Sequence, residues 1–334
     1  MQWGKRMKHA NLPARAATAM LCSCCSIVAA AHDGGGLSGQ TATAPEPIDQ
    51  ALGETRQGHG SISIAYINTL VNGFKAGGMK IPIGAVRSHT LSFGVDYFLT
   101  DNWSVSADIP YIINRYRGPD PHCPTSAPPP CAHFQVLQHP HPESKFLDDG
   151  KFHGDWQDWG FGGAYHANFH DYLLTPFANL YIPSHAYTFY SQAAVGTRLR
   201  RLEVGATLAH QFAFSNLYYR LGYARVFQQR TTDQNVDYNK VDLEAGYFLN
   251  PAWSVKLFAN GKKGGGYTGE YDFTSDIWYR HDQRAPHAYA SAGFGTDWRF
   301  NDRYTLTGSL QREIWGLAIF DFKYALELRL TREF

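Results

Sequence analysis

Acidic and basic side chains recur at every second position in several segments of this 334-residue chain. The clearest case is residues 319–334, where Asp321, Lys323, Glu327 and Arg329 share one face of an extended strand and aromatic and leucine side chains share the other. Charges gathered on one face either pair as ion bridges that brace a protein interior or line a polar passage for solutes. Which of these two roles the charges have depends on how the strands that carry them are arranged.

The same alternation predicts an inward-facing set of charged residues along the chain. The set is Asp96, Asp108, Arg220, Asp242, Glu244, Lys256, Asp297, Arg299, Glu313, Lys323, Glu327 and Arg329. Both signs occur in quantity and pair readily, which favours a lattice of ion pairs that braces the interior. A polar conduit or selectivity ring is the alternative interpretation.

The N-terminal residues predict export. Four basic residues precede or open a short apolar core at 16–28, and alanines at 29–31 provide a small-residue cleavage site, so we assign residues 1–31 to a secretory signal peptide. A lipoprotein cleavage box at 21–24 is the alternative, but the apolar core continues past it. Removing the signal lowers the formal net charge from +1 to about −3, which argues against a nucleic-acid partner.

The exported part of the chain keeps two cysteines, Cys123 and Cys131. Two cysteines at this spacing in an exported chain favour a disulfide that staples a loop. The same loop is rich in histidine and proline, and His139 and His141 suggest Zn²⁺ or Cu²⁺ as an alternative. Because the histidine spacing matches no metal-ligand motif, we predict neither a metal site nor a cofactor.

Signals for catalysis are weak. A barrel enzyme that acts on lipid would need a nucleophile beside a histidine on its outer surface. His210 and Ser309 are candidates by strand parity, but the chain has no G-x-S-x-G motif to support them. We therefore predict that the protein is not an enzyme.

Residues 58–334 show the pattern of an all-β, transmembrane antiparallel β-barrel, and residues 32–57 that of a disordered periplasmic lead-in. Five short turns, expected in the periplasm, alternate with six longer loops, expected outside the cell. They separate about 12 strands, with ten or fourteen as alternatives, and the strands are expected at 59–72, 87–99, 103–116, 156–168, 172–183, 198–212, 216–228, 237–249, 252–263, 287–300, 303–314 and 319–334. A soluble β-sandwich would alternate similarly but with shorter strands.

The alternation also predicts which side chains face lipid. In the strand at 87–99 the expected outward residues are Leu91, Phe93, Val95, Tyr97 and Leu99, with Ser92, Gly94 and Asp96 inside. Trp103 and Trp253 each follow a short turn, which predicts an aromatic belt at the periplasmic interface.

The order of motifs between residue 61 and about residue 259 resembles that of a known family. The stretches are SHTLSFGVDYFLTDNWSVSADIPYI at 88–112, GDWQDWGFGGAYHANF at 154–169 and YFLNPAW at 247–253. They resemble the outer-membrane proteins grouped with meta-pathway phenol degradation, a transporter family of about this size. The resemblance implies a small barrel that passes small, often aromatic or apolar molecules, and it defines no binding or catalytic residue. The His- and Pro-rich loop departs from the family pattern and leaves the solute open.

These patterns predict an outer-membrane channel or transporter for a small, aromatic or apolar solute, located in the bacterial outer membrane. A structural or partner-binding barrel with a plugged lumen is the first alternative, and a lipid-acting barrel enzyme is the second. The expected partners are outer-membrane lipid, the small-molecule solute and the barrel-assembly machinery, which would recognise the terminal Phe334.

Overall fold

The computed structural model describes residues 56–76, 79–119, 145–169, 171–213, 215–265, 280–284, 288–317 and 319–334. The signal peptide expected at 1–31, nearly all of the lead-in expected at 32–57, and the pair Cys123 and Cys131 lie outside these residues. Within the described ranges, no helix is both long enough and apolar enough to cross a membrane.

Antiparallel strands make up almost all of the described structure. The strands are β1 (Gly60–Ala76), β2 (Met79–Phe98), β3 (Trp103–Arg117), β4 (His153–Trp156), β5 (Asp158–Tyr165), β6 (Ala167–Phe169), β7 (Tyr172–Pro183), β8 (Arg201–Gln211), β9 (Leu217–Gln228), β10 (Tyr238–Asn250), β11 (Trp253–Gly264), β12 (Ala288–Asn301), β13 (Tyr304–Leu317) and β14 (Ile319–Glu333). One short helix, α5 (His281–Arg284), precedes β12.

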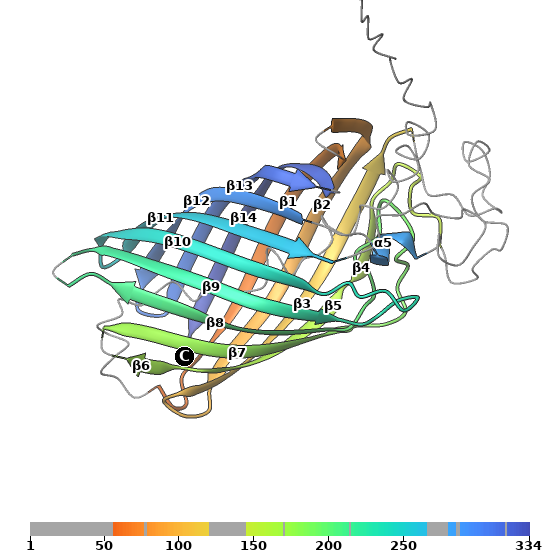
Figure 1. Cartoon of the computed structure of the whole chain (residues 1–334). Coiled ribbons are helices and arrows are strands. Elements are labelled where there is room, and N and C mark those ends of the chain that lie inside the picture. The colour runs from red at the N-terminus through yellow and green to blue at the C-terminus, as the bar shows by residue number, and fades with distance from the viewer. Residues whose placement is uncertain are drawn as a thin grey trace, which may run out of the picture.

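The sheet closes on itself as a barrel (Figure 1). Neighbouring strands pair antiparallel, and β1 pairs with both β2 and β14, which joins the two ends of the sheet. The short strands β4, β5 and β6 follow one another in a single place in the wall, between β3 and β7, so the described strands fill twelve positions. The predicted twelve-stranded antiparallel barrel is therefore confirmed.

The two faces of the wall differ as the alternation predicts. The side chains of Leu91, Phe93, Val95, Tyr97 and Leu99 are exposed, whereas Ser92 is buried. Trp103 is exposed near the short turns, and Trp253 stacks on Trp298 with ring centroids 5.4 Å apart. A closed wall with an apolar outer band and aromatic residues at its edge satisfies every strand hydrogen bond without water. The protein belongs to the bacterial outer membrane.

Two details of the wall differ from the sequence prediction. The hairpin of β1 and β2 continues to Ala76 and Met79, where a loop at 73–86 was expected, because strand pairing persists beyond a β-bulge near residue 73. The fourth strand is broken at Gln157, whose backbone N–H bonds to the Pro110 carbonyl. Pro110 has no N–H to offer in return, so the regular ladder is interrupted there.

Candidate functional site

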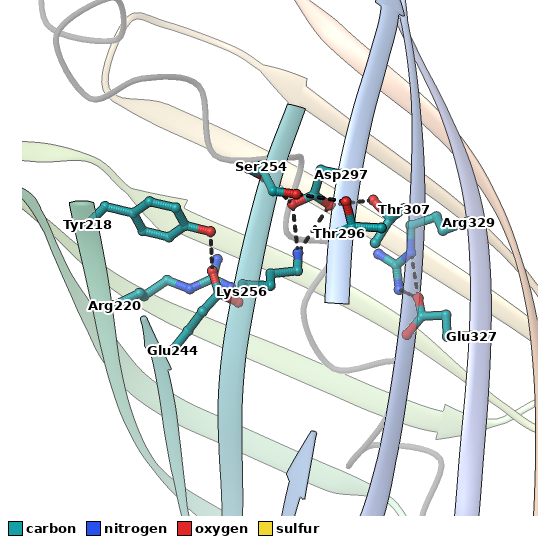
Figure 2. A network of polar contacts seen from close by, with 10 residues as sticks. All are labelled: Tyr218, Arg220, Glu244, Ser254, Lys256, Thr296, Asp297, Thr307, Glu327 and Arg329. Carbon is teal, nitrogen blue, oxygen red and sulfur yellow. Dashed lines mark hydrogen bonds and ion pairs between the residues drawn. The ribbon is translucent and has the colours of Figure 1, made fainter. Parts of the chain in front are cut away.

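The inward face of the barrel holds networks of charged and polar side chains, several of which Figure 2 shows together. On β9 and β10, Arg220 pairs with Glu244 at 2.9 Å, and the Tyr218 hydroxyl donates to the same carboxylate at 3.2 Å. Glu244 thus receives two donors from the neighbouring strand. An acid held by two donors on the neighbouring strand helps to fix the two strands in register.

Asp297 is the centre of a second network, on β11, β12 and β13 (Figure 2). Its carboxylate pairs with Lys256 at 3.0 Å and accepts hydrogen bonds from Ser254 at 2.9 Å and Thr307 at 2.7 Å. The Lys256 and Asp297 side chains are only 8% and 5% exposed. The hydrogen bonds from Ser254 and Thr307 offset part of the cost of burying this charge pair.

A third network lies at the end of the barrel that carries the long connections. Asp321 on β14 contacts Lys75 at 3.3 Å, Lys80 at 2.5 Å and Lys323 at 2.6 Å. Lys75 also pairs with Glu313 at 2.7 Å. These pairs join β1 and β2 to β13 and β14 across the closure of the barrel.

The predicted charged set lies at inward-facing positions of these strands. In addition to the pairs above, Arg329 contacts Glu327 at 2.8 Å and Arg299 contacts Glu333 at 3.7 Å. Asp108 accepts a hydrogen bond from Ser92 at 2.5 Å. The remaining two, Asp96 on β2 and Asp242 on β10, are half-buried. Opposite signs are thus paired in most of the set, which is the arrangement that the bracing interpretation requires.

Sequence reasoning missed a deeply buried network on β5, β7, β8 and β10. Arg201 pairs with Asp158 at 3.3 Å, with side chains 3% and 2% exposed. Glu203 pairs with Lys240 at 2.9 Å and accepts the Tyr181 hydroxyl at 3.3 Å. Arg201 and Glu203 alternate with leucine and valine, so strand parity alone would have found them.

Residues 187–199 form a buried segment between β7 and β8, which we call the inserted segment. The sequence predicts a long outer loop at 184–197, but the side chains here are buried rather than exposed. Tyr187 and Val195 pack against Ile112, which lies on the inward face of β3. The inserted segment therefore folds inward against the barrel wall.

Polar side chains of the wall satisfy the backbone of the inserted segment. Asn114 on β3 donates to the Ala194 carbonyl at 2.8 Å. The Tyr187 hydroxyl donates to Asp158 at 2.5 Å and accepts the Arg198 backbone N–H at 2.8 Å. Burial, and then the neighbouring charge of Asp158, raise the pKa of the Tyr187 phenol well above its usual range. The phenol thus stays a hydrogen-bond donor.

Asp148, in the connection before β4, binds the inserted segment most directly. Its carboxylate accepts the Ser191 hydroxyl at 2.6 Å, the Gln192 backbone N–H at 2.9 Å and the Ala193 backbone N–H at 2.8 Å. Three donors directed at one buried acid make a strong, specific attachment. Asp148 therefore holds the connection before β4 and the inserted segment together by hydrogen bonds.

A third connection reaches the inserted segment from α5. The Gln283 side chain donates to the Thr197 carbonyl at 2.7 Å and accepts the Thr231 hydroxyl at 3.1 Å. Connections that lie far apart in sequence thus meet at one end of the barrel, where Figure 1 also draws α5. Three connections are therefore hydrogen-bonded to one another at this end of the barrel.

The structure separates the two candidates for surface catalysis. His210 on β8 stacks on Tyr172 with ring centroids 4.6 Å apart, in the outward aromatic belt. Ser309 on β13 pairs in register with the inward residue Glu327. The two residues lie on opposite faces of the wall. In the described part of the chain there is also no group of three potential metal ligands, and the His- and Pro-rich stretch at 120–144 lies outside it.

Comparisons with known proteins agree with this architecture. No protein-family model and no curated protein matches the sequence. Among solved structures, the COG4313 outer membrane channel from Pseudomonas putida F1 is similar with a TM-score of 0.61 and 14% identity, over 83% of this chain and 96% of that one. The CymD monoaromatic hydrocarbon channel is similar with a TM-score of 0.43 and 11% identity, over 91% and 97%. At 14% identity, the similarity to the COG4313 channel shows the fold alone, which is that of an outer-membrane β-barrel.

Proposed function

We propose that this protein is an outer-membrane channel that passes a small solute through a narrow, polar lumen. The observation that carries the proposal is the inserted segment, which lies inside a closed barrel and is fixed to the wall by Asp148 and Asn114. Twelve strands enclose a space between that of a filled eight-stranded barrel and that of a sixteen-stranded porin. A segment folded into such a space sets the size of what crosses.

The finer proposal is that the solute is aromatic or apolar and that the chain is a relative of the phenol-degradation outer-membrane proteins. It rests on the sequence stretches at 88–112, 154–169 and 247–253. The interior tyrosines Tyr181 and Tyr218 are themselves buried in the wall, so the proposal of an aromatic solute rests on those sequence stretches. The paired charges around these tyrosines leave little net field to favour either sign of ion.

The test is single-channel recording of the refolded mature chain in a planar bilayer, with heat-modifiable gel migration to verify the barrel. Discrete conductance steps that phenol-like solutes block would support both levels of the proposal. Steps without such block would retain the channel and reject the aromatic solute. A folded barrel without conductance would reject the channel.

A barrel with a sealed lumen whose loops bind a partner is the second candidate. The same inserted segment favours it, because Ser191 and Ala193 are fully buried. The absence of conductance together with protection of residues 187–199 from hydrogen exchange would select this function over the channel.

We also propose that Phe334 is the residue that the barrel-assembly machinery recognises. It closes the seam with Gly60 through two backbone hydrogen bonds of 2.9 and 3.0 Å, and its ring remains half exposed. Deleting Phe334 should slow insertion into membranes that contain the assembly machinery without slowing refolding in detergent. An equal effect in both media would make its role structural.

A further inference from the structure

Three arginines form an outward-facing patch on β2 and β3, which we call the arginine patch. Arg87 lies directly opposite Arg115 in the strand register, and Arg117 lies two positions beyond Arg115. Residues at alternate positions share one face of a strand, and Ile109 and Tyr111 place this face on the outside of the barrel. Like charges directly across two strands repel each other, so this placement calls for a counter-charge from outside the strands.

The arginine patch lies where the apolar band ends. On β3 the outward positions from Trp103 to Ile113 are aromatic or apolar, and Arg115 is the next. A tilted strand crosses the hydrocarbon layer in about 9–11 residues, which is the length of this run. Because Trp103 lies at the end with short turns, Arg115 lies at the level of the outer-leaflet headgroups.

The described part of the chain supplies no carboxylate to the arginine patch. Among the described residues, none of the three arginines forms an ion pair with a carboxylate, and Arg115 instead lies over the Phe152 ring at 4.4 Å. The acids nearest in sequence to Phe152 are Asp149 and Asp155, each three positions away, and they contact His153 at 2.7 Å and His185 at 3.2 Å. Partial burial opposes ionisation of Asp149, but the hydrogen bonds from His153 and the Lys151 backbone lower its pKa.

Arg225 is an outward-facing arginine whose charge is balanced by a carboxylate of the same chain. It lies on the outward face of β9, and its guanidinium contacts Asp237 at 3.3 Å and Asn239 at 3.2 Å. Within the described ranges, a carboxylate therefore meets this outward arginine and none meets the arginine patch. The difference points to a ligand that brings its own negative charge.

A collar of hydrogen-bonding groups lies beside the arginine patch. The Tyr66 hydroxyl contacts His89 Nδ1 at 2.7 Å, and the Asn68 side chain contacts the same nitrogen at 3.1 Å. Tyr324 donates to Asn68 at 3.0 Å. Polar groups on a lipid-facing surface are costly unless they meet the polar part of a lipid. Along the wall, the arginines, the polar collar and the apolar band thus follow one another in the same order as the phosphate, sugar and acyl chains of a glycolipid.

We propose that the arginine patch binds the phosphates of the phosphorylated glycolipid in the outer leaflet. Arginine donates paired N–H groups that match phosphate oxygens, and three arginines suit a headgroup with more than one phosphate. The bound lipid would relieve the repulsion between Arg87 and Arg115. This site is independent of whatever passes through the lumen.

Binding of lipid A to the purified full chain, followed by native mass spectrometry in detergent, tests the site. Dephosphorylated lipid A and phosphatidylglycerol are the lipid controls. The variant combining R87Q, R115Q and R117Q should bind lipid A roughly a hundredfold more weakly, at about fivefold per arginine. R225Q should bind as the wild type does, because Arg225 is already paired.

Equal binding of lipid A by the triple variant and the wild type would overturn the site. Equal binding of phosphatidylglycerol and lipid A by the wild type would overturn the choice of glycolipid. If the triple variant does not show heat-modifiable migration, R87Q and R117Q are measured singly, and each should weaken binding by about fivefold. Unchanged binding in both single variants would equally reject the proposal.

Discussion

Replacing Asp148 should release the inserted segment and open the barrel. Asp148 is buried and accepts three donors from residues 191–193, two of them backbone N–H groups. In Asp148→Asn, one oxygen keeps the bonds to Ser191 and Ala193, while the amide nitrogen faces the Gln192 N–H and cannot accept it. Asp148→Ala removes all three acceptor contacts.

The expected size of the effect follows from this geometry. A hydrogen bond to a charged group contributes about 1.5–3 kcal/mol, so Asp148→Asn should raise the population with the segment displaced by about 10- to 150-fold. Asp148→Ala should raise it further, because the backbone N–H groups of Gln192 and Ala193 both lose the Asp148 acceptor, although the Ala193 N–H still meets the Ser191 hydroxyl at 3.1 Å. The wild-type segment should remain in place almost all the time.

Single-channel recording measures the displaced population as long-lived openings, and hydrogen exchange of residues 187–199 reports the release directly. Asp149→Asn is the matched control, since Asp149 is the adjacent, exposed acid and contacts only His153 and Lys151 among the described residues. If Asp148→Ala speeds exchange in the segment but leaves the conductance and open time unchanged, the segment does not control the passage and the reasoning fails.

Three further outcomes are expected. Asp297→Asn should lower the free energy of unfolding by about 3–5 kcal/mol, since it leaves Lys256 buried without its carboxylate; urea unfolding in vesicles measures this, and combining Lys256→Met with Asp297→Leu should restore most of the loss. Asp108→Ala should shift ion selectivity toward anions and Arg329→Ala toward cations, and unchanged reversal potentials in both would assign these charges to bracing alone. Trp253→Ala should lower stability by about 1 kcal/mol through lost stacking, and an unaltered unfolding midpoint would exclude that contribution.

The wall of the barrel is predictable from sequence because strand geometry is local. A period of two decides which side chains meet lipid, and turn residues such as those at 100–102 mark where the chain reverses. Leu91 and Val95 therefore lie outside and Ser92 inside, as expected. The charged positions follow from the same parity, although parity gives no partner: that Lys256 meets Asp297 depends on the register between β11 and β12.

The inserted segment is not predictable in this way. Residues 187–199 show no period of two, and their mixture of aromatic, small and polar residues does not predict which side of the wall they occupy. What folds them inward is a set of contacts distant in sequence: Asp148 lies 43 to 45 positions from its partners, and Asn114 lies 80 positions from Ala194. Such contacts appear only once the barrel has brought the connections together.

The pairing of β1 with β14 also constrains how the molecule can form. Asn68 and Tyr324, which meet at this seam, are 256 positions apart, so the seam gains its hydrogen bonds only after nearly the whole chain has been made. Until then both edges of the growing sheet expose unpaired N–H and C=O groups, which invite pairing with other chains. A chain cut before β14 would therefore yield no smaller working barrel. In the periplasm, the two unpaired edges of the sheet have to be kept from pairing with other chains until the last strand is in place.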